Sequence, residues 1–186
     1  MSTFLSTKEV SFRPIEQTDL VKLRDWRNTL GLRMRMREYR PLSMENQKRW
    51  FESLIDSKNV MFIIEHADEP IGVCGVTNID WKNRSAEISC HIGEEEYKTP
   101  KYYRHTFYLL CEYTFRELGL HRFRGESYVL DEGYDEWLQM FLAFGFKVDG
   151  YVRDTYWWDG KWYRSVLVAI LEDEWNAVRE GYLDGE

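Results

Sequence analysis

The sequence predicts an α/β domain with a mixed, mostly antiparallel sheet of about six to seven strands and helices on its faces. The hydrophobic patterns follow the order β-α-α-β-β-β-α-β-α-β-β along the chain. Three of the strand patterns are consecutive between residues 60 and 92, with only turn residues between them, which indicates an antiparallel meander. No glycine fingerprint of a dinucleotide or P-loop fold is present, so those two fold classes are excluded.

The strand segments are short runs rich in branched and aromatic residues, bounded by turn signals. We expect them at 9–14, 60–65, 71–79, 85–92, 122–129, 147–157 and 162–171. Asp159-Gly160 is a strong hairpin-turn pair between the last two. The chain shows no internal repeat or linker, so residues 1–186 are interpreted as a single domain.

The helical segments have apolar residues at helical spacing. We expect them at 18–28, 43–54, 101–118 and 134–144, with a turn or short helix at about 30–38 and another after 172. Thr18 and Ser43 are the expected N-caps, and Gly119 and Gly145 the expected ends.

Charge limits the possible partners. The net charge of −7 argues against a nucleic-acid binder, which needs a basic footprint. Nine basic residues nevertheless lie between Lys22 and Arg49, opposed by only three acidic ones. This segment is interpreted either as a solvated helical face or as a site for an anionic substrate.

Cysteine and histidine usage suggests a cytoplasmic protein without a metal site. The three cysteines form no close pair, which is typical of a reducing compartment. We see no signal peptide and no membrane-length apolar run. The four histidines are scattered without ligand spacing, so no metal is expected.

Short motifs along the chain, from about residue 12 to 175, carry a family resemblance. They are Phe12-Arg13-Pro14 with Thr18-Asp19, Trp26-Arg27-Asn28, Pro70-Ile71-Gly72, Ala86-Glu87-Ile88, Tyr113-Thr114-Phe115, Gly145-Phe146 and Glu174-Trp175. In this order and spacing the chain resembles the GNAT superfamily of N-acetyltransferases, and within it the ribosomal-protein and amino-sugar-nucleotide branch. The resemblance implies the GNAT fold, acetyl-CoA as cosubstrate, and direct attack on the thioester by a primary amine of a small molecule, an amino-sugar nucleotide or a peptide N-terminus.

The phosphate loop is where the chain departs from the family pattern. The family's glycine-containing loop aligns with residues 96–104, which contain no glycine, and Pro100 lacks an amide donor. The resemblance assigns cofactor binding to this loop and to the preceding strand, at Cys90, His91, Ile92, Lys98, Thr99, Lys101, Tyr102, Tyr103 and Arg104. The alternative is a degenerate scaffold that has abandoned acetyl-CoA and acts as a binding or regulatory module or uses another acyl donor.

The resemblance also nominates catalytic and acceptor residues. Glu87 is the expected general base, with His91 as the second candidate, and Tyr134 is the expected general acid. Ser127 and Tyr128 are alternative acids, because Phe141 stands where the family often has tyrosine. The expected acceptor residues are Trp26, Arg27, Asn28, Arg33, Arg35 and Trp157. The aromatic hairpin around Trp157 is equally interpreted as a homodimer surface.

Overall fold

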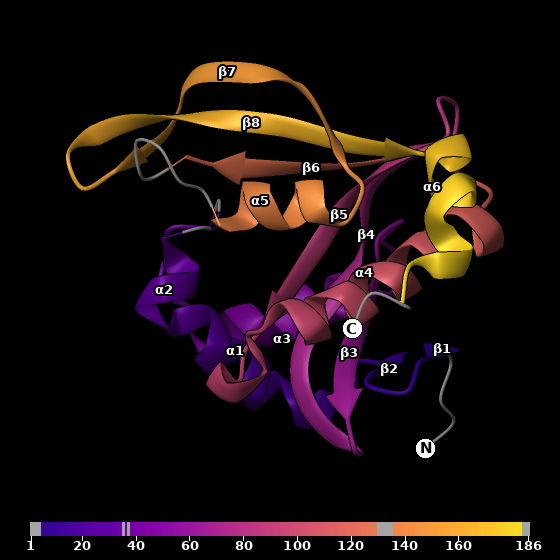
Figure 1. Cartoon of the computed structure of the whole chain (residues 1–186). Coiled ribbons are helices and arrows are strands. Elements are labelled where there is room, and N and C mark those ends of the chain that lie inside the picture. The colour runs from indigo at the N-terminus through magenta and orange to yellow at the C-terminus, as the bar shows by residue number, and fades with distance from the viewer. Residues whose placement is uncertain (1–4, 35, 37, 130–135, 184–186) are drawn as a thin grey trace.

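A computed structural model describes residues 5–34, 36, 38–129 and 136–183. Their strands form one eight-stranded sheet in the order β1-β2-β3-β4-β5-β6-β8-β7 (Figure 1). The strands are β1 (Leu5–Ser6), β2 (Ser11–Pro14), β3 (Val60–His66), β4 (Glu69–Asp80), β5 (Ser85–Ile92), β6 (Arg122–Tyr128), β7 (Lys147–Trp158) and β8 (Lys161–Leu171). All neighbours are antiparallel except β5 and β6, which confirms the mixed sheet, and β1 adds a strand that the sequence did not predict.

Six α-helices accompany the sheet among the described residues. They are α1 (Leu20–Asn28), α2 (Leu30–Arg33), α3 (Met44–Ser53), α4 (Pro100–Glu112), α5 (Glu136–Ala143) and α6 (Glu172–Val178). The Ser43 cap is confirmed, because its hydroxyl accepts a bond from the Asn46 amide. The Thr18 cap is wrong, because a 3₁₀ turn capped by Glu16 precedes α1. Gly119 and Gly145 follow α4 and α5 at positive φ, as their expected role requires.

Helices cover both faces of the sheet. Leu20, Leu23 and Trp26 of α1 pack with Ile63 and Val73 in one cluster, to which α3 also contributes. The larger core lies on the other face, where α4 and α5 bring a group of aromatic rings against β6 and β8. The strands between these layers therefore have residues of both faces buried. No helix in the described part of the chain is long and apolar enough to cross a membrane.

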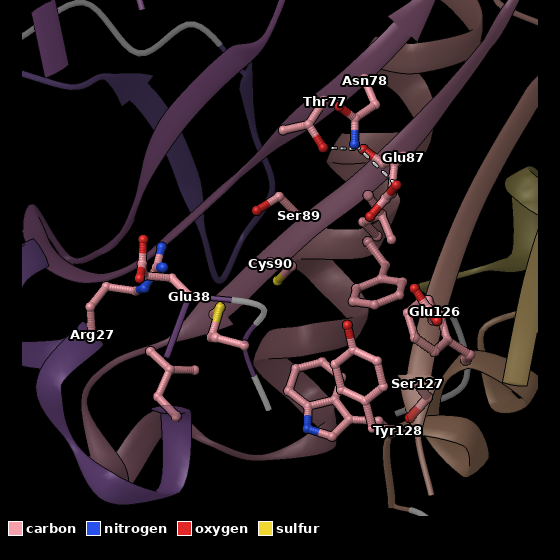
Figure 2. Close-up of a pocket in the computed structure, with 16 residues that line it drawn as sticks. Arg27, Glu38, Thr77, Asn78, Glu87, Ser89, Cys90, Glu126, Ser127 and Tyr128 are labelled. Carbon is pink, nitrogen blue, oxygen red and sulfur yellow. Dashed lines mark hydrogen bonds between the residues drawn. The ribbon is translucent and has the colours of Figure 1, made fainter. Parts of the chain in front are cut away.

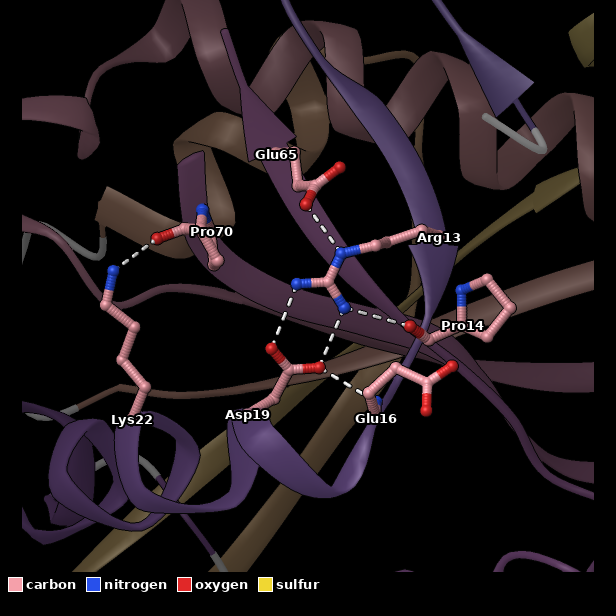
Figure 3. Close-up of polar contacts among 7 residues, drawn as sticks. All are labelled: Arg13, Pro14, Glu16, Asp19, Lys22, Glu65 and Pro70. Carbon is pink, nitrogen blue, oxygen red and sulfur yellow. Dashed lines mark hydrogen bonds and ion pairs between the residues drawn. The ribbon is translucent and has the colours of Figure 1, made fainter. Parts of the chain in front are cut away.

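A buried ion-pair network joins the end of β2 to the start of α1 (Figure 3). Arg13 binds Asp19 through two guanidinium nitrogens, at 2.7 and 2.9 Å, and Glu65 of β3 at 2.5 Å. Asp19 also accepts the Glu16 amide at 2.8 Å. Arg13 is 6% exposed and Asp19 7%. The network therefore fixes the entry of α1 onto the sheet in a water-poor environment.

The parallel pairing of β5 and β6 is short. It covers only Ser85↔Arg122 to Glu87↔Arg124, although β5 continues to Ile92 and β6 to Tyr128. On its other side β6 stays paired with β8 along its whole length, and β5 stays paired with β4. The two strands therefore diverge after Glu87 and leave a wedge in the middle of the sheet.

Candidate active site

The wedge exposes backbone groups of β5. The Gly93 amide donates to the Ile71 carbonyl at 2.8 Å, which makes these two residues a hydrogen-bonded pair of the β4–β5 ladder. Because such pairs alternate along antiparallel strands, Glu87, Ser89 and His91 turn their backbone groups to β4. Ile88, Cys90 and Ile92 then turn theirs into the wedge. Among the three strand residues predicted to face the cofactor, His91 thus differs from Cys90 and Ile92 in the direction of its amide.

A cavity of about 390 Å³ occupies this wedge (Figure 2). Its floor is the divergent part of β5 and β6, and its walls come from α2, α4 and α5. The polar and charged residues that line it are Arg27, Glu38, Thr77, Asn78, Glu87, Ser89, Cys90, Glu126, Ser127 and Tyr128.

Glu87 lies at the point where the two strands diverge. One carboxylate oxygen accepts the Asn78 side-chain amide at 3.1 Å and lies 3.3 Å from the Arg124 guanidinium. The side chain is only 14% exposed, yet it lines the cavity. These contacts hold the carboxylate group beside the wedge, within the cavity where a general base is needed.

Tyr128 and Cys90 lie on opposite strands of the wedge. In Figure 2 the Tyr128 hydroxyl points into the cavity toward Cys90, while the ring stacks on Tyr156 with centroids 4.2 Å apart. Burial raises the pKa of the Cys90 thiol well above its usual range, so it is a poor nucleophile. Phe141, by contrast, packs edge-on against Phe107 in the core. Tyr134, the expected acid, lies outside the described residues.

A second cavity, of about 720 Å³, extends from the end of β5 to the N-terminus of α4 and the side of α5. Lys98, Thr99 and Arg104 line it, and the Thr99 side chain makes no capping bond to the helix. Two of the three glutamates at 94–96 are paired: Glu94 with Lys22 and the Trp26 indole, and Glu95 with Lys98. Hydroxyl and cationic donors at a helix N-terminus are the chemistry that fits a phosphate group.

Four residues of the predicted phosphate loop differ in where they lie. Tyr103 and Arg104 line the second cavity, although Arg104 also donates to the Tyr182 carbonyl at 3.3 Å. Lys101 and Tyr102 require a correction. Lys101 pairs with Glu9 at 2.8 Å and lies over the Tyr102 ring, whose other contacts are His66 and Tyr97. In the first turn of α4 these two side chains lie on the face of the helix toward Glu9 and His66 of β3, away from the second cavity.

His91 is an almost fully buried histidine that lines two cavities. It is 3% exposed, and its Nε2 atom has no hydrogen-bond partner among the described residues. Burial lowers its pKa to about 3, with further contributions from the charges of Arg27 and Lys98. The ring is therefore neutral at physiological pH and is a poor proton acceptor.

The depressed pKa of His91 predicts a pH-dependent stability. Below about pH 6.5, the ordinary histidine pKa, the unfolded chain takes up a proton that the folded chain refuses until about pH 3. The free energy of unfolding therefore falls as the pH is lowered through this window, by about 2–3 kcal/mol at pH 4. Urea titrations of wild type and His91→Gln between pH 7 and pH 4 should show a smaller fall in the free energy of unfolding for the variant. Parallel pH curves for the two proteins would contradict this account.

The predicted acceptor residues have different roles in the structure. Arg27 lines the wedge cavity. Trp26 instead packs its ring against Gly93, where a Cβ atom would approach within 2.1 Å. Asn28 uses both ends of its amide on the Leu42 backbone, so it positions the chain before α3. For Asn28 the acceptor role is corrected to a structural one, whereas Trp26 both packs on Gly93 and lines the second cavity.

Three further expectations concern the basic segment and the hairpin. Arg33 donates to the Tyr39 carbonyl and lines none of the cavities described above. Arg35 lies outside the described residues. Trp157 is 55% exposed at the far end of the β7–β8 hairpin, against Trp162, so its assignment to the acceptor cleft is corrected. Tyr156 of the same hairpin stacks on Tyr128, which lines the wedge cavity, and its hydroxyl donates to the Met34 carbonyl.

Several cavity residues were not predicted as site residues. Glu38, Asn78, Ser89 and Glu126 line the wedge cavity, and nothing in the local sequence marks the first three. Glu126 could have been found from the alternation of β6, which places it on the same face as Tyr128, an expected alternative acid. The described residues contain no group of three or more metal-ligating side chains.

Comparison with known proteins places this geometry in a family. A family model described as an acetyltransferase (GNAT) domain matches residues 12–167. The fold matches a spermidine N-acetyltransferase from Vibrio cholerae, solved in complex with CoA and spermine, at a TM-score of 0.83 and 20% identity over 91% of this chain and 99% of that one. It also matches a probable acetyltransferase at a TM-score of 0.78 and 21% identity, over 94% and 99% of the two chains. No curated protein matches the sequence.

Proposed function

The chain belongs to the acetyltransferase (GNAT) domain family, whose members use acetyl-CoA, and we propose that it transfers the acetyl group to a primary amine of a small molecule. The observation that carries this proposal is the divergence of β5 and β6 after Glu87, because it joins open strand amides to a cavity with a carboxylate at its edge. The larger cavity at α4 supports a cofactor site beside it.

Each part of the wedge is assigned one task. Bound acetyl-CoA supplies a thioester carbonyl. The amides of Ile88 and Cys90 stabilise the negative charge that develops on its oxygen. Glu87, directly or through a water molecule, takes the proton from the attacking amine, and Asn78 and Arg124 keep the carboxylate in place. Tyr128 donates a proton to the departing sulfur.

Lys98, Thr99 and Arg104 are the residues proposed to hold the CoA phosphates, together with the N-terminus of α4. Tyr103 and Ile92 shape the same cavity. This assignment replaces the glycine amides of the usual family loop with side-chain donors. It also weakens the alternative of a degenerate scaffold, because two of the three glutamates before α4 are paired with lysines.

The acceptor is proposed to be a small amine, with an amino-sugar nucleotide and a peptide N-terminus as further candidates within the family. Spermine is the amine in the Vibrio cholerae structure, and its fold supports a small acceptor here. The free thiols Cys74, Cys90 and Cys111 support a cytoplasmic location. The exposed Trp157–Trp162 pair supports a homodimer contact at the hairpin.

Calorimetry and product analysis test the proposal. Isothermal titration should give micromolar dissociation constants for acetyl-CoA and CoA. Incubation with acetyl-CoA and a panel of amines should give products 42 Da heavier, an acetyl group in place of a hydrogen, in mass spectra. Absence of binding to both nucleotides would overturn the proposal, and binding without any acetylated product would favour the binding-module alternative.

A further inference from the structure

We propose that the acceptor carries an anionic oxygen group, a carboxylate or a phosphate, in addition to its amine, and that Arg27 binds this group. The inference rests on the proposed function, because it concerns the substrate of the same site. Three observations carry it. The guanidinium of Arg27 is half-buried and has no protein partner among the described residues, and the imidazole of His91 has an unpartnered nitrogen. The charge of the lining residues also changes from the wedge cavity to the third cavity, and these two cavities are called the acceptor space below.

Arg27 is a cation whose charge no neighbour fully balances. It lies in the last turn of α1 and lines both the wedge cavity and a third cavity, of about 220 Å³, between α1, α3 and the sheet. Burial lowers its pKa, against an opposing contribution from the charge of Glu38. Its guanidinium makes no hydrogen bond or ion pair with any described residue. A desolvated guanidinium normally acquires a partner, so a ligand is its natural counterion.

Glu38, the carboxylate nearest to this charge, is already committed. It accepts two bonds from the Arg40 side chain, both at 2.9 Å, and one from the Arg40 backbone at 3.1 Å. These bonds and the charge of Arg27 hold the pKa of Glu38 at about 2, so it stays ionised. One carboxylate, Glu38, therefore lies between the charges of two arginines, Arg27 and Arg40. The three side chains together keep a net positive charge.

His91, in the wall of both the second and the third cavity, carries a second unused polar atom. It is 3% exposed, it lines this cavity together with Arg27, and its Nε2 atom is the one without a hydrogen-bond partner. A buried polar atom without a partner costs free energy unless something binds it. A neutral imidazole can donate one N–H to an anionic oxygen, beside the fork of Arg27.

The acceptor space is acidic at one end and basic at the other. Arg27, Glu38 and Ser89 line both the wedge cavity and the third cavity, so the two cavities adjoin at these side chains. Glu87 and Glu126 are the other charged residues of the wedge.

At the far end, Arg40 and Arg49 line the third cavity, and Glu38 is its one described carboxylate, although Arg40 pairs with Glu38 and Arg49 with the exposed Glu45 outside the cavity. An amine placed near Glu87 and an anion placed near Arg27 match this arrangement. A molecule with a second cationic group, such as a polyamine, would bring like charges together at Arg27.

Four short amines test the inference: propylamine, 3-aminopropanoate, phosphoethanolamine and 1,3-diaminopropane. We expect kcat/KM at saturating acetyl-CoA to be at least about tenfold higher for one or both anionic amines than for propylamine, since a charged hydrogen bond is worth that much. A preference for 3-aminopropanoate identifies a carboxylate, and one for phosphoethanolamine a phosphate. A preference for 1,3-diaminopropane, or equal values for all four, would overturn the inference.

Two variants on α1 locate the effect. Arg27→Gln should bring the ratio of kcat/KM for the anionic amine to kcat/KM for propylamine close to one. Arg27→Lys should give an intermediate ratio, because lysine keeps the charge but cannot donate two parallel hydrogen bonds as a guanidinium does. Arg24→Gln is the matched control. Arg24 lies one turn earlier on the same helix, pairs with Asp25 and lines none of the three cavities, so this variant should keep the wild-type ratio. If Arg24→Gln loses the preference for the anionic amine as Arg27→Gln does, a specific role of Arg27 is contradicted.

A binding measurement separates this inference from the proposed function. Sodium acetate and sodium phosphate, at up to about 50 mM and against sodium chloride of equal ionic strength, should raise the melting temperature of the wild type and of Arg24→Gln. The rise should shrink in Arg27→Gln. This readout needs neither acetyl-CoA nor turnover, so it holds even if no amine is acetylated. No rise in the wild type, or an equal rise in Arg27→Gln, would overturn the inference.

Discussion

The Glu87→Gln variant is expected to lose at least about 100-fold in kcat, the usual share of a positioned general base. Glutamine keeps the shape and can still accept the Asn78 bond, but its amide does not accept a proton from the amine. The side chain lies in the wedge and not at the α4 cavity, so the affinity for acetyl-CoA should change by no more than about twofold. Steady-state kinetics and isothermal titration on the same preparations measure the two quantities.

Glu126→Gln is the control for this prediction. Glu126 lines the same cavity from β6 and has the same charge, but it faces the wedge from the opposite strand. We expect its kcat to stay within about tenfold of the wild type. If Glu126→Gln is the impaired variant and Glu87→Gln is normal, the base is assigned to the wrong strand. The low-pH limb of the kcat profile offers a second readout, because it should disappear only in the variant that lacks the base.

The fold was largely predictable because its signals are local. The meander of β3, β4 and β5 follows from alternating hydrophobic runs separated by turn residues, and all three strands are confirmed. Asp159-Gly160 forms the predicted hairpin turn, with both residues at positive φ. The two-residue strand β1 escaped prediction, because its pairing with β2 depends on a turn at 7–10 held by the Thr7 hydroxyl and not on a hydrophobic pattern.

The site was less predictable because it depends on where two strands part. The family motif marks Glu87, but the divergence of β5 from β6 is a tertiary feature without a sequence pattern. The motif Trp26-Arg27-Asn28 shows the limit clearly. Three adjacent residues point in three directions on a helix, so Trp26 packs on Gly93, Asn28 holds the Leu42 backbone, and only Arg27 faces the acceptor space.

The orientation of α1, and with it the position of Arg27, depends on the ion pairs of Arg13. Arg13→Met is expected to lower the free energy of unfolding by about 3–5 kcal/mol, the usual result of leaving one partner of a buried pair without compensation. Two carboxylates lose their partner: Asp19, which is 7% exposed and would keep only the Glu16 amide, and Glu65 of β3, whose side chain is 12% exposed. Urea unfolding at pH 7, followed by far-UV circular dichroism, measures the loss. Arg24→Met, which breaks a pair at the surface of α1, should cost no more than about 1 kcal/mol.

The stability difference between wild type and Arg13→Met is expected to depend on pH, which a loss of packing alone would not produce. Burial tends to raise the pKa of Asp19, but the Arg13 and Glu16 hydrogen bonds outweigh it, and the pKa lies below its ordinary value. A carboxyl group with a depressed pKa in the folded state stabilises the protein above its unfolded pKa of about 3.9, and the contribution is lost as the pH falls through the folded value. Arg13→Met removes the main cause of the depression, so its deficit relative to the wild type should shrink below about pH 4. A deficit that is constant from pH 7 to pH 3 would show that Arg13 acts through packing and not through its charge. A deficit that shrinks would show that Arg13 stabilises the start of α1 through its charge interaction with Asp19.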